Sequence, residues 1–280
     1  MALAATFSAS AQQKYTVSIK NNLKSALNDV PATLDLRELK DVKSATVIVD
    51  GKEIPYQIDD LDGNGTNDEL CFLVDLEGKQ TKTATITLSN KADGKLWKAR
   101  TYAEMVLRNP KVKEKNKHDI YLSSITIDKR TTNPYNVLHH HGVAFESELI
   151  AMRIYMDKRQ TIDLYGKFHK GLELEQTQFY TSKEQKAQGY GDDVLWVGNT
   201  FGLGAFRGWN GTEPTLLEDV EHRTQRILTT GPLRTIVEVE DNQWTITPGA
   251  EPVNATIRYT LYAGHRDFDV DVTFNKDVSA

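Results

Sequence analysis

The fold is decided by the stretch Met152-Arg-Ile-Tyr-Met-Asp-Lys-Arg-Gln-Thr-Ile-Asp-Leu-Tyr-Gly-Lys167. Apolar and polar residues alternate in it at the two-residue period of a β-strand, before and after the polar sequence Lys158-Arg-Gln160. The apolar positions are Met152, Ile154, Met156, Ile162 and Leu164. The polar positions are Arg153, Tyr155, Asp157, Asp163, Tyr165 and Lys167. This alternation predicts an antiparallel hairpin with one apolar face that packs on a core.

The polar face of this hairpin is a candidate binding surface. A three-residue connection predicts the cross-strand pairs Asp157–Thr161, Tyr155–Asp163 and Arg153–Tyr165. Guanidinium and ammonium groups bind carboxylates, and tyrosine hydroxyls take part in proton transfer, so an acidic sugar fits this chemistry. The alternative is that the polar residues form the solvated side of an amphipathic sheet.

The rest of the chain also has the pattern of β-structure. Short β-rich segments separated by Asn, Asp, Gly and Pro fill the first part, and longer ones return after Tyr121, among them residues 172–180 and 267–274. We therefore expect an all-β protein, with a large antiparallel β-sandwich at residues 96–280 and a smaller N-terminal β region at 12–95. The chain stops at Val278-Ser-Ala280 without an obvious closing element, which would fit a missing C-terminal part.

Composition limits the classes of partner. The chain has 280 residues, 39% of them hydrophobic, and a net charge of -5, which gives no broad basic field for nucleic acid. No segment approaches the roughly 20 apolar residues of a membrane span. The opening residues 1–11 are typical of the end of a signal peptide, cleaved after Ala9-Ser-Ala11, so we expect a periplasmic or secreted protein. The single Cys71 is expected to be a buried apolar residue.

A loop rich in oxygen ligands is a candidate calcium site. The sequence Asp60-Leu-Asp-Gly-Asn-Gly-Thr-Asn-Asp-Glu69 places oxygen ligands at the spacing of a calcium loop. The expected ligands are Asp60, Asp62, Asn64, Thr66 and Asp68. A structural calcium ion is expected there, and the alternative is a turn that binds no ion.

The three consecutive histidines His139, His140 and His141 are candidate acid–base groups. In an extended segment His140 points away from the other two, so at most two converge, which is too few for a zinc site without further ligands. We favour acid–base chemistry at His140 or His141 over metal binding. The alternative is a loop of hydrogen-bonded histidines without a chemical role.

Glycine-rich loops supply further candidates. Tyr190, Arg207 and Trp209 stand beside glycines, where an aromatic face or a guanidinium can approach a sugar. The glycine spacing does not match a dinucleotide-binding loop, so we expect no nucleotide cofactor. For Trp209 the alternative is a place in the core.

Four segments together resemble the family of exported bacterial proteins called domain of unknown function 4861. They are Gln57–Leu70, the run His139-His-His-Gly142, Arg153–Lys167 and Tyr262-Ala-Gly-His-Arg-Asp-Phe268. The resemblance spans nearly the whole mature chain. It implies a galactose-mutarotase-like β-supersandwich and a role in polysaccharide breakdown, and lyases that share this fold imply chemistry on uronic acids. Members of the family are usually longer than this chain.

We therefore expect a lyase or dehydratase that eliminates at a uronic-acid residue of an oligosaccharide. The expected catalytic residues are His140, His141, Tyr155 and Tyr165. The expected substrate-binding residues are Arg153, Asp163, Lys167, Tyr190, Arg207 and Trp209. The alternatives are a non-catalytic carbohydrate-binding protein that uses the same side chains, and a hydrolase or epimerase on the same fold. A hydrolase would need two carboxylates, for which Asp157 and Asp163 are the candidates.

Overall fold

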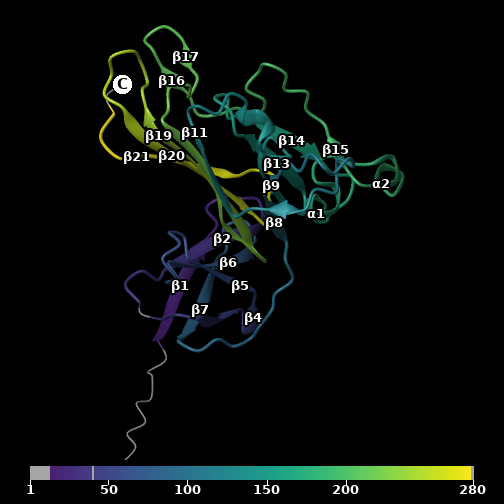
Figure 1. The fold of residues 1–280 in the computed structure, drawn as a ribbon. Helices are drawn as coiled ribbons and strands as arrows, with labels where there is room; N and C mark the ends of the chain where they lie inside the picture. Colours follow the sequence, from purple (N-terminus) through teal and green to yellow (C-terminus); the bar gives the residue numbers. More distant parts are fainter. Residues whose placement is uncertain (1–12, 40, 279–280) are drawn as a thin grey trace, which may run out of the picture. The chain divides into compact units, whose positions relative to one another are not determined.

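The computed structural model describes residues 13–39 and 41–278. The chain divides into two compact units, Met1–Lys98 and Ala99–Ala280, whereas the sequence placed the boundary after residue 95. Figure 1 shows the strands of the first unit in purple to blue and those of the second in teal to yellow. The predicted signal-peptide remnant, residues 1–11, lies outside the described residues.

The first unit has two antiparallel sheets in its described part. Its strands are β1 (Gln13–Lys20), β2 (Leu27–Asp35), β3 (Ser44–Val49), β4 (Lys52–Ile54), β5 (Tyr56–Asp59), β6 (Glu69–Leu76) and β7 (Thr81–Ser89). One sheet has the strand order β1-β7-β3-β4 and the other β2-β6-β5. Val47, Ile86, Leu70 and Phe72 are fully buried, because apolar side chains on the inner faces of the strands leave water together. Cys71 on β6 is fully buried as predicted.

The second unit carries the longer strands. They are β8 (Thr101–Glu104), β9 (Val106–Leu107), β10 (Ile120–Tyr121), β11 (Ser124–Asp128), β12 (Gly142–Ser147), β13 (Ile150–Tyr155), β14 (Ile162–Gly166), β15 (Asp192–Asp193), β16 (Gly208–Trp209), β17 (Pro214–Thr215), β18 (His222–Thr230), β19 (Arg234–Trp244), β20 (Val253–Tyr262) and β21 (Asp269–Phe274). Its helices are the 3₁₀ turn η1 (Pro134–Asn136), α1 (Leu174–Thr177) and α2 (Lys183–Ala187).

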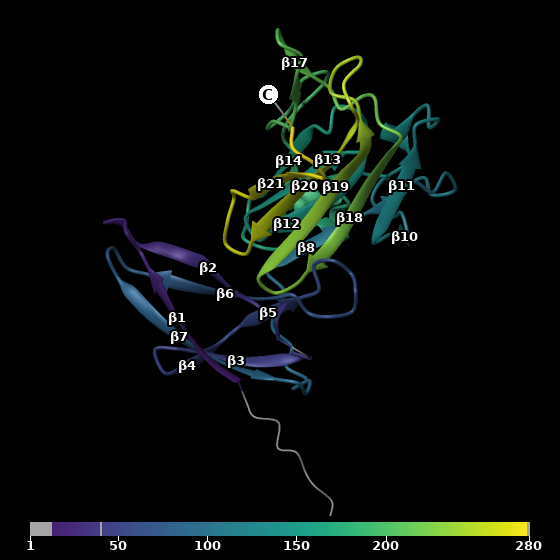
Figure 2. The same cartoon turned by 90° about the vertical axis from the view of Figure 1, so that its left-hand side faces the viewer.

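Two five-stranded antiparallel sheets make a sandwich in this unit. One has the order β11-β18-β19-β20-β21 and the other β15-β14-β13-β12-β8, and Figure 2 shows β18, β19 and β20 side by side in the first. Met152 and Ile154, the predicted apolar face of the hairpin, pack in one core with Val237, Val239 and Ile257 of the opposite sheet. The prediction of an all-β, sandwich-like protein is confirmed.

Some predicted elements are wrong. Residues 172–180 do not form a strand but contain the short helix α1, within a segment that leaves the sheet after β14 and returns at β15. Residues 101–104, which precede the predicted return of β-structure after Tyr121, form the edge strand β8. Among the described residues, no helix is long and apolar enough to cross a membrane.

Candidate active site

The predicted hairpin exists, with a register shifted from the predicted one. Arg153 pairs with Asp163, and Ala151 with Tyr165, so the predicted pair Arg153–Tyr165 is wrong. The connection is longer than three residues, because the last backbone hydrogen bond joins the amide of Tyr155 to the carbonyl of Thr161. A shift of two residues keeps every side chain on its predicted face, since faces alternate with a period of two.

The polar face of the hairpin is buried. The side chains of Arg153, Tyr155, Asp163 and Tyr165 belong to residues that are at most 3% exposed, so the interpretation as a solvated face is wrong. The segment between β14 and β15 helps to cover them, and the ring of Phe179 lies 4.2 Å from the guanidinium carbon of Arg153. Buried charges of this kind require partners, because an unpaired ion in the interior is strongly destabilising.

Arg153 finds its partners within a connected network. Its Nε donates to Oδ2 of Asp163 at 2.9 Å, and its Nη1 donates to the hydroxyl oxygen of Tyr180 at 3.0 Å. Asp193 on β15 accepts from Nη2 at 3.1 Å, and the hydroxyl of Tyr155 donates to Asp163 at 3.0 Å. Three strands, β13, β14 and β15, are thereby tied to the segment that contains Tyr180, and the guanidinium is fixed against the Tyr180 hydroxyl.

Tyr180 is in turn hydrogen-bonded to His141. Its hydroxyl lies 2.9 Å from Nε2 of His141, and Nδ1 of His141 lies 2.9 Å from the carbonyl oxygen of Tyr135. A carbonyl only accepts, so Nδ1 carries the proton of a neutral His141 and Nε2 accepts from the hydroxyl of Tyr180. The geometry therefore places an unprotonated ring nitrogen within hydrogen-bond distance of the Tyr180 hydroxyl.

Burial sets the charge states of this pair. Loss of water lowers the pKa of His141 to about 4, with the charge of Arg153 acting in the same direction, so the imidazole is neutral at pH 7. Burial raises the pKa of Tyr180, while the charge of Arg153 and its hydrogen bond to Tyr180 oppose that rise. Arg153 thus favours a negative charge on the Tyr180 oxygen.

The backbone is strained at this point. His141 has φ 66°, the left-handed conformation that side chains other than glycine seldom adopt, and Phe179, just before Tyr180, has φ 67°. After His141 comes Gly142, where an added Cβ would lie 1.6 Å from the carbonyl oxygen of Ile154. Such strain is often found at functional sites, where the surrounding structure holds a side chain in a required position.

A cavity of about 440 Å³ opens beside His141 and Tyr180. We call it the histidine cavity, and its lining consists of Arg108, Asn109, Pro110, Val112, Lys113, Lys115, His118, Asn136, Leu138, His139, His141 and Tyr180. Three cationic side chains and three histidines are in this lining, and no described residue in it is a carboxylate. Its lining therefore suits an anionic ligand.

Further contacts order this lining. The ring of His118 stacks on that of His139 with centroids 4.0 Å apart, and the ammonium of Lys115 lies 5.1 Å from the centre of the Tyr180 ring. Nε2 of His139 is buried and has no hydrogen-bond partner among the described residues. Tyr180 and Lys115 also line a neighbouring cavity of about 440 Å³, so Tyr180 is reached from two sides.

The predicted catalytic residue His140 does not line the histidine cavity. It is fully buried, with Nδ1 3.0 Å from the carbonyl oxygen of Gln178 and Nε2 2.9 Å from Oε1 of Glu104. Burial lowers the pKa of His140 to about 3 and raises that of Glu104 to about 8, so both groups are neutral at pH 7. This pair lies buried between β8 and the segment that follows α1, and neither residue is in the lining of the histidine cavity.

Two other predicted residues are buried in ion pairs or hydrogen bonds apart from His141. The ammonium of Lys167 pairs with the carboxylate of Glu146, and both side chains are at most 1% exposed. The hydroxyl of Tyr165 donates to Glu173 at 2.9 Å, which ties β14 to the residue that precedes α1. The contact between Tyr165 and Glu173 helps to hold the segment between β14 and β15 over the polar face of the hairpin.

Tyr190, Arg207 and Trp209 are not among the residues that line the histidine cavity. Trp209 is 60% exposed on β16, so it is not a core residue. The guanidinium carbon of Arg207 lies 4.3 Å from the centre of the Phe201 ring. Tyr190 is half-buried, and its backbone amide donates to the carbonyl oxygen of Gln185 in α2.

In the first unit, the predicted calcium loop brings three carboxylates together. Ligand atoms of Asp60, Asp62 and Asp68 lie within 4.8 Å of one another. The side-chain oxygen of Asn64 accepts from the backbone amide of Thr66 at 2.7 Å, and Asp60 accepts from the amide of Gly65 at 2.7 Å. Carboxylate oxygens at this separation are suitable ligands for calcium. Backbone amides of the loop already donate hydrogen bonds to some of the same side-chain oxygens.

The sequence missed several lining residues. Tyr180 lies in a segment that was expected to be a strand. Lys113 and Lys115 belong to a run of alternating lysines directly before His118. That basic run beside a histidine is the signal from which the cavity could have been inferred. The local sequence around Arg108 does not indicate a binding site, because Arg108 reaches the histidines only through the tertiary fold.

The comparisons with known proteins show the family and leave the chemistry open. The family described as Domain of unknown function (DUF4861) matches residues 19–280, and the chain belongs to this family. A search of curated proteins found no match.

Proposed function

We propose that this protein is a carbohydrate-active lyase or dehydratase that eliminates at a uronic-acid residue of an oligosaccharide. The observation that carries the proposal is the hydrogen-bonded series Tyr135, His141, Tyr180 and Arg153, which ends at a cavity lined by cations. This arrangement joins an anion-binding site to a proton acceptor, the two features that elimination from a uronate needs.

The cationic lining supplies the first requirement. A carboxylate of the substrate placed near Arg108 and Lys113 would be neutralised by them, and this makes the proton on C5 of the sugar more acidic. Arg153, Lys167 and Arg207 were the predicted carboxylate partners. We assign this role to the cavity cations instead, because Arg153 and Lys167 are paired with buried carboxylates.

Tyr180 and His141 supply the base. Tyr180 passes its own proton to Nε2 of His141, and the phenolate oxygen that this leaves takes the C5 proton. Nη1 of Arg153 stabilises the negative charge on that oxygen between the two transfers. Tyr155 takes no direct part, because its hydroxyl is committed to Asp163. It acts with Asp163 as a positioning residue for Arg153.

The step balances as a β-elimination. The C5–H electron pair forms the C4–C5 double bond, and the C4–O4 bond breaks as its electrons go to the leaving oxygen. We assign Lys115 as the group that protonates that oxygen, since its ammonium lies over the ring of Tyr180. Tyr180 ends the step neutral, with the proton from C5. The His141 imidazolium then releases its proton to solvent and the Lys115 amine takes one from solvent, which restores the starting charges of the site.

A non-catalytic carbohydrate-binding protein is the second candidate. The same cations and aromatic rings would hold an acidic sugar without turnover, and Trp209, 60% exposed, would suit stacking on a sugar ring. A hydrolase has less support, because Asp163 is fully buried and Asp157 is paired with Arg159.

Calcium and export complete the proposal. We propose a structural calcium ion held by Asp60, Asp62 and Asp68, with no part in the elimination. We also propose export to the periplasm or the medium, where polysaccharides are found, on the basis of residues 1–11.

The direct test is the ultraviolet absorbance of the product, because elimination alone among these reactions makes a conjugated unsaturated uronate. Purified protein with calcium is mixed with oligosaccharides that contain glucuronate or galacturonate. We expect rising absorbance that His141→Ala abolishes and that His169→Ala, an exposed histidine outside the cavity lining, leaves unchanged. Tight binding without any rise would favour the binding protein.

A further inference from the structure

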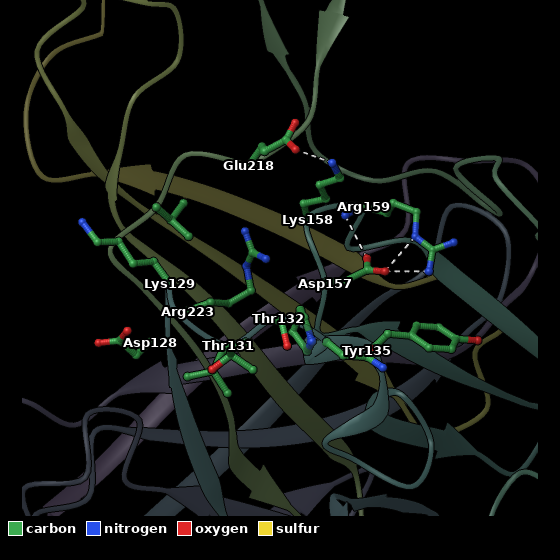
Figure 3. A pocket seen from close by; sticks show the side chains of 14 residues that line it. Asp128, Lys129, Thr131, Thr132, Tyr135, Asp157, Lys158, Arg159, Glu218 and Arg223 are labelled. Carbon is green, nitrogen blue, oxygen red and sulfur yellow. Dashed lines mark hydrogen bonds and ion pairs between the residues drawn. The ribbon is translucent and has the colours of Figure 1, made fainter.

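A third cavity, of about 420 Å³, is lined in part by Asn133, Pro134 and Tyr135 at the turn η1, and Figure 3 shows its lining side chains. We call it the Arg159 cavity, and its lining consists of Ile127, Asp128, Lys129, Thr131, Thr132, Asn133, Pro134, Tyr135, Asp157, Lys158, Arg159, Glu218, Val220 and Arg223. Tyr135 of η1 lines this cavity, while the next residue, Asn136, lines the histidine cavity. One turn of chain therefore separates the two.

Two stacked rings join the cavities. The ring of Tyr135, which lines the Arg159 cavity, lies parallel to the ring of His141, which lines the histidine cavity, with centroids 3.7 Å apart and planes at 9°. A ligand that contacts both cavities would thus pass beside the proposed catalytic histidine.

The charge of the Arg159 cavity differs from that of the histidine cavity. Its cations have carboxylate partners: Arg159 pairs with Asp157, Lys158 with Glu218, and Lys129 with Glu221. The buried Arg223 is held by Asp241 at 2.6 Å. The Arg159 cavity is therefore close to neutral, whereas the histidine cavity has cations without a carboxylate in its described lining.

Its polar groups are held in place before a ligand arrives. Asp157 accepts from the backbone amide of Arg159 at 2.9 Å and from its Nε at 2.8 Å, and Nη1 of Arg159 donates to the carbonyl of Gly198 at 2.9 Å. Figure 3 shows Asp157 and Arg159 beside Tyr135. Fixed donors and acceptors of both kinds, with the hydroxyls of Thr131 and Thr132, match the hydroxyl groups of a sugar.

We propose that the Arg159 cavity binds a neutral sugar, joined to the uronate that occupies the histidine cavity. The inference rests on the proposed function and narrows its substrate to oligosaccharides in which uronate alternates with neutral sugar. A second uronate is disfavoured in the Arg159 cavity, because its carboxylate would meet Asp157 and Asp128 without a free cation to compensate it.

The test compares binding and turnover of two defined ligands. One is an alternating tetrasaccharide of galacturonate and a neutral hexose, and the other is tetragalacturonate. We expect Arg159→Ala and Lys158→Ala to weaken calorimetric binding of the alternating ligand by about tenfold or more and to leave galacturonate monosaccharide binding unchanged. Lys158 has a half-exposed side chain, so its variant is expected to fold even where Arg159→Ala does not.

A control variant and two readouts, binding and product formation, distinguish failure of the neutral-sugar site from failure of the lyase activity. Arg266→Ala removes an exposed arginine outside both linings and is expected to change nothing. Equal affinity for the two tetrasaccharides, or equal loss of both in the Lys158→Ala variant, would overturn the neutral-sugar site even if unsaturated product forms. Preference for the alternating ligand that depends on Lys158, without any unsaturated product, would support this site and refute the lyase.

Discussion

The hydroxyl of Tyr180 lies 2.9 Å from Nε2 of His141, whose other ring nitrogen lies 2.9 Å from the carbonyl oxygen of Tyr135. This contact joins a residue of the segment between β14 and β15 to a histidine held in a strained backbone conformation. Of the three consecutive histidines, His141 is the one whose ring nitrogen lies within hydrogen-bond distance of the Tyr180 hydroxyl in the described structure. The contact therefore distinguishes His141 from its two neighbours.

His141→Gln is predicted to lower turnover without unfolding the protein. The amide keeps a polar side chain in a similar volume and cannot act as a base, so we expect kcat to fall by about 10² to 10⁴. The measurement is kcat together with thermal melting. Unchanged kcat in a folded variant would remove His141 from the mechanism.

Stability is predicted to fall as pH decreases from about 6.5 to about 4. The pKa of His141 is lowered to about 4 in the folded state, so between these values the unfolded chain binds the proton and the folded chain does not. Folding has no such cost above about pH 6.5, where the histidine is neutral in both states.

Denaturant unfolding at several pH values measures this effect. We expect the free energy of unfolding of His141→Gln to change with pH by about 1.4 kcal/mol per pH unit less than that of the wild type, within that window. His139 and His140, whose pKa values are lowered to about 2 and about 3, contribute in the same direction and remain in both proteins. Equal slopes would show that His141 is not buried as described.

Removal of one partner of the buried ion pair Arg153–Asp163 is predicted to lower the stability of the protein. Arg153→Met leaves the carboxylate of Asp163 buried without its cation, which we expect to destabilise the protein by about 3–5 kcal/mol. The double variant Arg153→Met with Asp163→Leu is expected to recover most of that loss in urea unfolding. A single variant as stable as the wild type would contradict the burial of this pair.

Calcium is predicted to stabilise the first unit. An ion that binds only the folded loop adds about 2.7 kcal/mol at a concentration 100 times its dissociation constant, so melting should shift upward on addition of calcium. Asp60→Asn with Asp62→Asn should abolish the shift, whereas Glu38→Gln, an exposed position in the same unit, should preserve it. A shift that survives in the double variant would place the ion elsewhere.

The fold was predicted well where its signal is local. Alternation in residues 152–167 gave the hairpin and its two faces, because side-chain direction in a strand depends only on position. It could not give the register, since the length of the connection between Tyr155 and Thr161 depends on the turn. Nor could it show that the polar face is buried, because the segment that covers it is placed by tertiary contacts such as Tyr165 with Glu173.

The site was predicted in part for the same reason. His141 and Arg153 were identified by their chemistry, and the structure joins them through Tyr180, which lies in a segment without a clear pattern. Local sequence cannot distinguish His140 from His141. Their different surroundings arise from the left-handed backbone at His141, which directs its ring to the cavity.

The elimination at Tyr180 is tested most directly by the rate of unsaturated product formation from a uronate-containing oligosaccharide, measured with hydrogen or deuterium at C5, for the wild type and Tyr180→Phe. We expect conjugated product, a slower rate with deuterium, and loss of turnover in a folded Tyr180→Phe variant that still binds the oligosaccharide. Binding without conjugated product, or full turnover in Tyr180→Phe, would contradict the proposed elimination.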